Sequence, residues 1–154
     1  MFPSTTERVP LHTAAHVNEQ IRRRAEENVA RYADASPEVI DRRLQELDQE
    51  WDVERTLEAN AATAVLVGVT LGATVHKGFF FFPAVVAGFL LQHAVQGWCP
   101  PMPVFRRMGF RTQTEIDQEK YALKALRGDF RDAGQGADGG RLVGPRQALE
   151  AARR

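Results

Sequence analysis

The sequence predicts an all-α fold: a transmembrane two-helix hairpin with amphipathic cytoplasmic helices on both sides and a disordered C-terminal tail. Two apolar runs, Ala61–Val75 and Phe79–Gly97, are separated by a three-residue break, and Lys77 is the single charged residue between Ala59 and Trp98. A helix that crosses the hydrocarbon core of a bilayer needs roughly 17 to 25 apolar residues. Each run, with its uncharged neighbours, is just long enough, and the short break favours a hairpin.

Two stripes of small and amide residues recur at every fourth position of these runs, so each stripe lies on one helix face. The first stripe comprises Asn60, Ala64, Gly68 and Gly72, and the second comprises Ala84, Gly88, Gln92 and Gln96. If the chain reverses at Lys77-Gly78, Gly68 lies level with Gly88. Small residues let membrane helices approach closely, and amides bond across the pair, so we expect the stripes to pack together. The alternative is that Ala and Gly are simply common in membrane helices.

The residues before the hairpin predict a lead and two helices. Residues 1–12 contain two prolines and no periodic pattern, which predicts a disordered lead. Residues 13–51 hold two amphipathic patterns, and each predicts a cytoplasmic helix. The second helix begins at Ser36-Pro37-Glu38, which supplies a capping hydroxyl, a proline in the first turn and an acid near the positive end of the dipole. At Asp52, either a new helix begins with this residue as its cap, or the preceding helix continues with a bend.

Residues 52–112 form the predicted membrane module, which ends in an interfacial segment. Pro100, Pro101 and Pro103 disfavour a continued helix. The arginines among the apolar residues that follow are typical of a segment lying on anionic headgroups. Residues 112–115, Thr-Gln-Thr-Glu, match a capping box, so residues 113–128 are predicted as a cytoplasmic helix that ends at a glycine. Residues 129–154 are Gly-rich with little apolar surface, which predicts a flexible tail.

The charges beside the apolar runs predict the orientation, because lysine and arginine accumulate on the cytoplasmic side. Three arginines closely precede Ala59 and three closely follow Trp98, whereas the intervening loop has only Lys77. Both termini are therefore predicted in the cytoplasm. No apolar segment precedes Ala59, so no cleavable signal peptide is expected. The residues expected at the membrane interface are Trp51, Trp98, Arg106, Arg107 and Arg111.

The composition excludes several classes of function. The net charge is zero, with −5 over residues 1–58 (8 basic, 13 acidic) and +4 over residues 99–154 (11 basic, 7 acidic), so no basic excess favours nucleic acid. A single cysteine excludes an internal disulfide framework. No phosphate-binding loop, metal motif, nucleophile elbow or carboxylate pair is present, so we predict no enzymatic activity, cofactor or metal. A soluble bundle is disfavoured because a chain of this size offers too little apolar surface to cover two such helices.

Three short motifs flank the apolar runs: Asp52-Val53-Glu54-Arg55 before them, and Gly97-Trp98-Cys99-Pro100 and Met108-Gly109-Phe110-Arg111-Thr112 after them. In this order, over residues 52–112, they resemble a family of small bacterial inner-membrane proteins of unknown function. The same module forms the two-helix membrane tail of the membrane-anchored rhodanese YgaP. The chain departs from the family with Asp52 in place of Asn and with Pro101-Met102 in place of Leu-Tyr. The resemblance implies a location in the bacterial inner membrane, self-association, and work alongside sulfur-transfer or thiol chemistry.

Cys99 is the residue with reactive chemistry, and two interpretations of it remain open. Arg106 and Arg107 are near it in the sequence, and nearby cations favour the thiolate, which is the nucleophilic and metal-binding form. Cys99 would then accept a persulfide or bind a soft metal; the alternative is a small apolar residue packed at a helix end. His93 stands six residues earlier, which predicts a different helix face, so a joint metal site is not expected.

The function predicted from the sequence is a non-enzymatic membrane anchor or scaffold. It contacts the lipid bilayer, forms a homo-oligomer and leaves its flanking helices free to dock a partner. The alternative is a sulfur-transfer or thiol-redox accessory protein that uses Cys99 at the cytoplasmic interface and works with a cytoplasmic protein.

Overall fold

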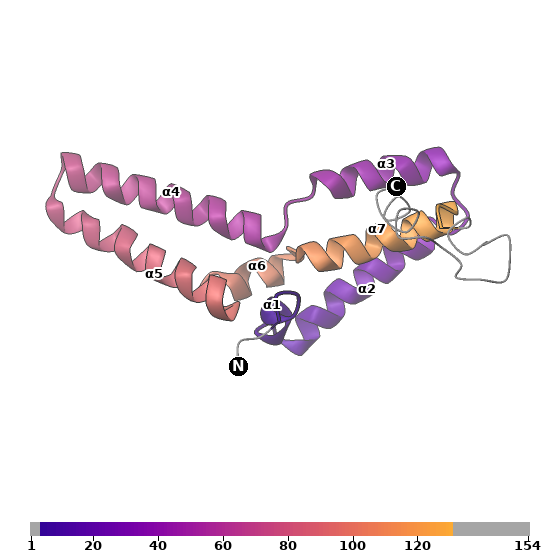
Figure 1. The fold of residues 1–154 in the computed structure, drawn as a ribbon, viewed down its shortest axis with the longest axis horizontal. Coiled ribbons are helices and arrows are strands. Elements are labelled where there is room, and N and C mark those ends of the chain that lie inside the picture. The colour runs from indigo at the N-terminus through magenta and orange to yellow at the C-terminus, as the bar shows by residue number, and fades with distance from the viewer. Residues whose placement is uncertain (1–3, 131–154) are drawn as a thin grey trace, which may run out of the picture. The chain divides into compact units, whose positions relative to one another are not determined.

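The computed structural model describes residues 4–130, which fold entirely into helices and turns (Figure 1). Two of its helical segments, ending at Thr74 and Gln96, are long and apolar enough to cross a membrane by length and composition. In chain order the elements are α1 (Arg8–Leu11), α2 (Ala15–Arg31), α3 (Pro37–Gln49), α4 (Val53–Thr74), the 3₁₀ helix η1 (Lys77–Phe80), α5 (Phe81–Gln96), α6 (Met102–Met108) and α7 (Gln113–Arg127).

The described residues divide into two compact units. The first unit comprises residues 4–24 and 51–116, and it contains both of the long apolar segments. The second unit comprises residues 25–50 and 117–130. The predicted tail falls largely on residues 131–154, which lie outside the described part of the chain.

The start of α4 resolves the choice between a new helix and a bent one. The chain leaves α3 at Gln49, and Asp52 adopts an extended conformation with its Oδ1 accepting a hydrogen bond from the Arg55 backbone N–H at 2.7 Å. A carboxylate at this position satisfies one of the free amides of the first turn. A new helix therefore begins here, with Asp52 as its cap. The predicted position of the start of α3 is also confirmed, because Ser36 is its N-cap residue and Pro37 its first residue, but the Ser36 hydroxyl makes no capping hydrogen bond.

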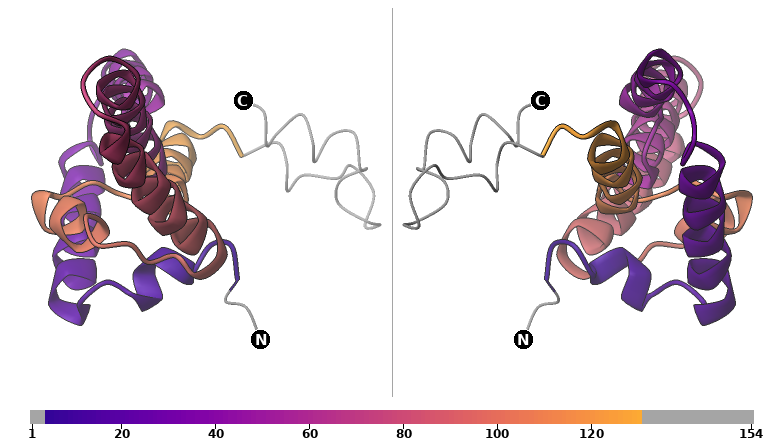
Figure 2. Two further views of the ribbon diagram at one scale, coloured as in Figure 1. Left: turned by 90° about the vertical axis from the view of Figure 1, so that its left-hand side faces the viewer. Right: turned by 90° about the vertical axis from the view of Figure 1, so that its right-hand side faces the viewer.

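α4 and α5 lie side by side and run in opposite directions, joined by η1 (Figure 1, Figure 2). They approach each other closely at two glycines of α4. A Cβ atom on Gly68 would lie 2.6 Å from Cδ of Pro83, and one on Gly72 would lie 2.8 Å from the Phe80 ring. By contrast, a Cβ atom on Gly88 would have no neighbour within 4 Å.

The predicted pairing of the two stripes is therefore wrong within the chain. Gly68 lies level with Pro83 and not with Gly88, five residues further along. Five residues are about 140° around a helix with 3.6 residues per turn, so Gly88 faces away from α4. Ala84 and Gln96 are exposed as well, and Gln92 is half-buried. On α4, Gly68 and Gly72 are buried, Ala64 is half-buried and Asn60 is exposed.

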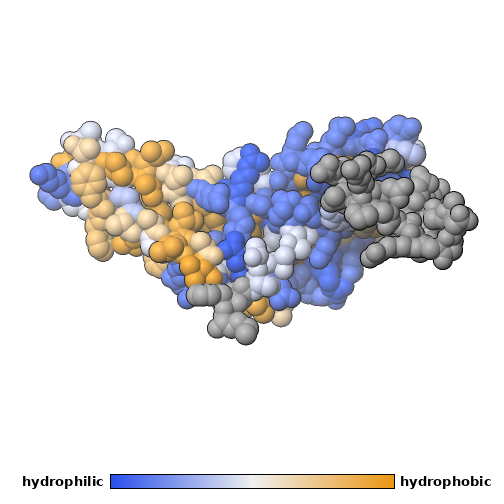
Figure 3. Space-filling model, in the orientation of Figure 1, coloured by the Kyte–Doolittle hydropathy of each residue, from blue (hydrophilic) through white to orange (hydrophobic). Residues whose placement is uncertain are grey.

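The outer surfaces of α4 and α5 are apolar and uncovered. Leu66 is 68% exposed, Phe81 76% and Leu91 67%. Figure 3 shows apolar side chains, in orange, gathered over these two helices. Large exposed apolar patches mark a surface that a protein or a membrane covers.

The first unit has its own small core at the ends of α4 and α5. It consists of Val9, Val53, Leu57, Cys99 and Met102, with Trp98, Phe105 and Phe110 packed against it. The prediction of a disordered lead is therefore wrong for the part that the structure describes. Pro10 is compatible with the single turn of helix in α1, which turns Val9 into the core. A helix of four residues is too short to give a periodic pattern in the sequence.

In the second unit, α3 and α7 bury a stripe of aliphatic residues and one charged residue. Ile40, Leu44, Leu47 and Leu123 are buried. The buried Glu119 carboxylate accepts hydrogen bonds from Arg43 at 2.9 and 3.1 Å and from Asn28 at 3.4 Å. Because a buried carboxylate needs partners for its charge, these contacts fix the position of α7 within this unit.

Candidate functional site

A tight turn after α5 carries Cys99 back toward the helix it follows. Gly97 ends α5 with a φ of 79°, and its N–H donates to the His93 carbonyl oxygen at 2.7 Å. A side chain at this position would meet the Arg8 backbone, since a Cβ atom there would lie 2.5 Å from its carbonyl carbon. Glycine is therefore required both by the left-handed conformation and by the close approach of α1. The turn leaves Cys99 4% exposed, within the core of the first unit.

Glu54, at the start of α4, connects the ends of three helices. Its Oε2 lies 3.0 Å from Nε2 of His93 on α5, and its Oε1 accepts a hydrogen bond from Arg8 on α1 at 2.9 Å. The Arg8 guanidinium also donates to the backbone carbonyl oxygen of Ala94 at 2.6 Å. This carbonyl is near the C-terminus of α5, where helix carbonyl groups lack partners and attract cations.

His93 is buried beside Glu54. It is 3% exposed, and its Nε2 lies 3.0 Å from Oε2 of Glu54, whereas its Nδ1 has no hydrogen-bond partner among the described residues. Cys99 follows the end of α5 at Gln96, so helical spacing does not relate it to His93.

An apolar cavity of about 410 Å³ opens beside the thiol, between α4 and α5. Its wall includes Ala61 and Ala64 from α4, Val86 and Leu90 from α5, and Cys99 and Pro100 from the turn that follows. This volume falls in the roughly 300–1,000 Å³ range of ligand pockets. The prolines add no N–H donor, so the cavity wall near the sulfur is largely apolar.

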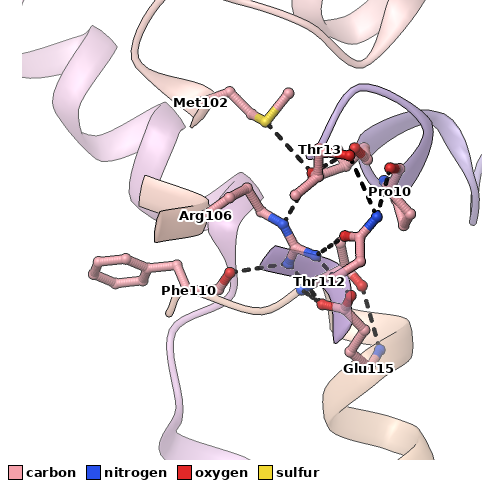
Figure 4. Close-up of polar contacts among 9 residues, drawn as sticks. Pro10, Thr13, Met102, Arg106, Phe110, Thr112 and Glu115 are labelled. Atoms are coloured by element: carbon pink, nitrogen blue, oxygen red, sulfur yellow. Dashed lines mark hydrogen bonds and ion pairs between the residues drawn. The ribbon is translucent and has the colours of Figure 1, made fainter. Parts of the chain in front are cut away.

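Arg106 on α6 is the centre of a buried polar cluster in the same unit (Figure 4). Its guanidinium contacts both carboxylate oxygens of Glu115 at 2.7 Å, Oγ1 of Thr13 at 3.1 Å and Oδ1 of Asn18 at 3.0 Å. A fifth bond, at 3.0 Å, goes to the Phe110 carbonyl oxygen. All five guanidinium donors are satisfied, so this cluster joins the starts of α2 and α7 to α6.

Glu115 has two roles in this cluster. The predicted capping box is confirmed, because Glu115 Oε2 accepts from the Thr112 N–H at 2.8 Å and Thr112 Oγ1 accepts from the Glu115 N–H at 3.3 Å. Burial alone would raise the pKa of Glu115, but the hydrogen bonds from Arg106 and from the Thr112 backbone outweigh burial and lower this pKa below its ordinary value. The glycine stop of α7 is confirmed as well, since Gly128 has a φ of 94°.

The five residues predicted at the membrane interface separate into two groups. Trp51 and Arg107 are exposed, and Trp51 stacks under the Arg55 guanidinium at 4.3 Å. Arg106 and Arg111 are buried, so neither reaches a headgroup, and Trp98 is half-buried against the core. The prediction of an interfacial position was wrong for Arg106 because two of its hydrogen-bond acceptors, on Thr13 and Asn18, lie about ninety residues away in the sequence.

Sequence reasoning did not identify Arg8, Glu54, Thr13 or Asn18 as members of these clusters. The one available signal was Glu54, a carboxylate about two turns before a long apolar run, in the motif that carries the family resemblance. Across residues 4–130, no three His, Cys, Asp or Glu side chains form a group that would hold a metal ion.

Comparisons with family models, with curated proteins and with solved structures find no match for this chain. The resemblance to the family of small inner-membrane proteins therefore rests on the three motifs quoted above.

Proposed function

We propose that this chain is an integral protein of the bacterial inner membrane, similar to the two-helix membrane tail of YgaP, and that it acts as a non-enzymatic anchor or scaffold. The observation that carries the proposal is the uncovered apolar surface of α4 and α5, with Leu66, Phe81 and Leu91 all more than 60% exposed. Water around so many large apolar side chains is unfavourable by about 25 cal/mol for each Å² exposed. Lipid removes this cost, so a bilayer is the solvent that fits the two helices.

The contacts of Arg8 support a hairpin whose two ends are on the same side of the membrane. Arg8 bonds to Glu54 at the beginning of α4 and to the Ala94 carbonyl near the end of α5. One short segment thus holds both ends, while Lys77 is at the opposite end of the pair. The cytoplasm is the side we propose for both termini, because the flanking arginines outnumber the single loop lysine.

Self-association is the second part of the proposal. Gly88 is on the outer surface of α5 with no side chain against it, and small residues on an outer face let a second membrane helix approach. In a scaffold of this kind, the polar helices of the second unit are the part that meets a cytoplasmic partner.

Membrane insertion is tested by alkaline carbonate extraction, in which an integral protein stays in the pellet. Orientation is tested in a Cys99→Ser background with one new cysteine at Thr6, Gly78 or Gln118, which are all exposed. A membrane-impermeant maleimide should label Gly78→Cys in intact spheroplasts, and the other two only after permeabilisation. Release of the chain by carbonate would contradict insertion, and the inverse labelling pattern would contradict the orientation.

A second candidate function is a sulfur-transfer or thiol-redox accessory that uses Cys99. It is favoured by one observation: Cys99 lines a cavity between α4 and α5, so a small reactant can reach its sulfur. Loss of thiol-dependent activity in Cys99→Ser would support the accessory function, and unchanged activity would support the scaffold alone.

A further inference from the structure

We propose that the first unit binds an anionic phospholipid: the lipid phosphate lies between Arg24 and Arg107, and one acyl chain lies in the apolar cavity between α4 and α5. The proposal rests on the membrane location proposed above and goes beyond it, because it assigns a defined lipid site to one end of the hairpin. Three features carry it: the exposed face of α6, the position of Arg24, and the place where the cavity meets α6.

The short helix α6 exposes apolar side chains and buries a charged one. Met102 and Arg106 form its buried face. Val104 is 55% exposed, and Met108, four residues further along on the same face, is 65% exposed. Arg107 is exposed beside them. A helix with apolar side chains and a basic residue on its outer face is typical of a helix that lies at a membrane interface.

Arg24 of α2 reaches the end of α6. A Cβ atom on Gly109, the residue that caps the end of α6, would lie 2.9 Å from Nη1 of Arg24. Gly109 is two positions after Arg107, and Cα atoms two positions apart in a helix are separated by about 5–6 Å. Both arginines are exposed, and within residues 4–130 neither guanidinium has a hydrogen bond or an ion pair with another residue. Two cations this close repel each other, and a phosphate that accepts hydrogen bonds from both would remove the repulsion.

The cavity reaches the start of α6. Pro100 and Pro101 are part of its wall, and Pro101 is the residue before Met102, where α6 begins. Arg107 is six positions after Pro101, which is about 9 Å along the helix. This length is close to the thickness of one headgroup layer, about 5–8 Å. A single phospholipid with a chain in the cavity therefore has its phosphate near Arg107.

The chemistry of this surface distinguishes an anionic lipid from other occupants. The cavity wall has no charged side chain, and its polar member, Asn60, has its amide nitrogen bonded to the Thr56 carbonyl oxygen at 2.8 Å, so a hydrocarbon chain fits the space. A zwitterionic headgroup brings its own cation toward the two arginines, which makes it a poorer match than an anionic headgroup. A second copy of this chain is disfavoured, because a two-fold interface sets the same surface against itself and would gather four guanidinium groups.

The test uses the full chain, purified in mild detergent and stripped of lipid. Phosphatidylglycerol or phosphatidylcholine with identical acyl chains is added, and bound lipid is counted by native mass spectrometry. We expect one phosphatidylglycerol per chain, bound at least about tenfold more tightly than phosphatidylcholine, because each basic residue near the headgroup favours the anion. Equal affinities would overturn the proposal. Excess inorganic phosphate should not displace the lipid, and displacement would identify a site for free anions in place of a lipid site.

The two arginines are tested against a neighbouring one. Arg24→Gln and Arg107→Gln should each weaken phosphatidylglycerol binding by about fivefold and leave phosphatidylcholine binding within about twofold. Arg23→Gln is the matched control, because it removes the same charge from an exposed position where the guanidinium is paired with Glu19. It should change neither affinity. Equal effects of Arg23→Gln and Arg24→Gln would show a response to net charge alone and would overturn the proposal.

A set of alanines tests whether the cavity holds the chain. Ala61 and Ala64 line the cavity, whereas Ala62 is on the exposed face of the same helix. Ala64→Phe should weaken the binding of both lipids at least about fivefold, because it fills the space that their common acyl chain needs. Ala61→Phe repeats the test at a second position of the wall, and Ala62→Phe should change neither affinity. Equal effects at positions 62 and 64, or no effect at 61 and 64, would overturn the assignment of the cavity.

Failure of this proposal is distinguishable from failure of the proposed function. A chain that resists carbonate extraction but binds the two lipids equally has the proposed membrane location and lacks the lipid site. Release of the chain by carbonate is the separate result that would contradict the proposed function itself.

Discussion

The guanidinium of Arg106 offers the most direct test of what holds the first unit together. Arg106→Met keeps most of the apolar stem and removes all five hydrogen-bond donors. Glu115 would then remain in its partly buried position without its cation, with only the Thr112 N–H still bonded to its carboxylate. The matched control is Arg107→Met, which removes the same charge from an exposed position one residue away.

The expected loss follows from the burial of the pair. Removing one partner of a buried ion pair costs about 3–5 kcal/mol, because the other charge is left uncompensated. Thr13 and Asn18 add little to this figure, since each keeps a second hydrogen bond, to the carbonyl oxygens of Val9 and Pro10. Glu115→Gln removes the charge but retains a side chain that can complete a capping box. The double variant should therefore cost at least about 1 kcal/mol less than the two single variants together.

The measurement is urea denaturation of the full chain in detergent micelles, followed by tryptophan fluorescence, with Trp98 reporting on the core of this unit. The reasoning is refuted if Arg106→Met changes the free energy of unfolding by no more than about 0.5 kcal/mol, the range of ordinary surface substitutions. It is also refuted if the single effects of Arg106→Met and Glu115→Gln simply add.

Three further predictions address the same unit. Gly97→Ala should destabilise the chain by more than the roughly 1 kcal/mol of a left-handed non-glycine residue, because the new Cβ atom meets Arg8; unchanged thermal stability would contradict this. Gly68→Ala should lower the melting temperature in micelles, because its new Cβ atom meets Pro83, whereas Gly88→Ala should leave the melting temperature unchanged. A lowered melting temperature in Gly88→Ala would instead indicate that the two four-residue stripes pack together. The lowered pKa of Glu115 stabilises the fold fully above the ordinary carboxyl pKa, and this contribution is lost as pH falls through the lowered value. A pH titration of stability should thus show a shallower acid limb in Glu115→Gln, and identical limbs would count against the ion pair.

Features encoded within a few residues could be predicted from the sequence, although for Asp52 the sequence left a cap and a bent helix as alternatives. The cap at Asp52 and the capping box at Thr112 depend on side chains three positions from the backbone groups that they satisfy. The start of α3 depends on Pro37 in its first turn, and the stop at Gly128 depends on the left-handed backbone that glycine allows. The two apolar helical segments could also be predicted, because length and lack of charge are properties of one continuous stretch of sequence.

Features that join distant stretches could not be predicted. The register of α4 against α5 depends on the 3₁₀ turn η1, which moves Pro83 to the place that a simple reversal gives to Gly88. The burial of Arg106 depends on Thr13 and Asn18, and a basic residue beside a membrane looks the same in sequence whether it meets lipid or a carboxylate. The pairing of His93 with Glu54 joins the end of α5 to the start of α4, 39 residues away in the sequence.

The packing of Val9 against Met102 has a consequence for how the chain is made. A ribosome that adds about 5–20 residues each second finishes α1 several seconds before its partners at the far side of α5 exist. α1 is thus made before the apolar stretch but reaches its packed position only after that stretch has been made. In the membrane location proposed above, assembly of this end of the unit would report that insertion has been completed.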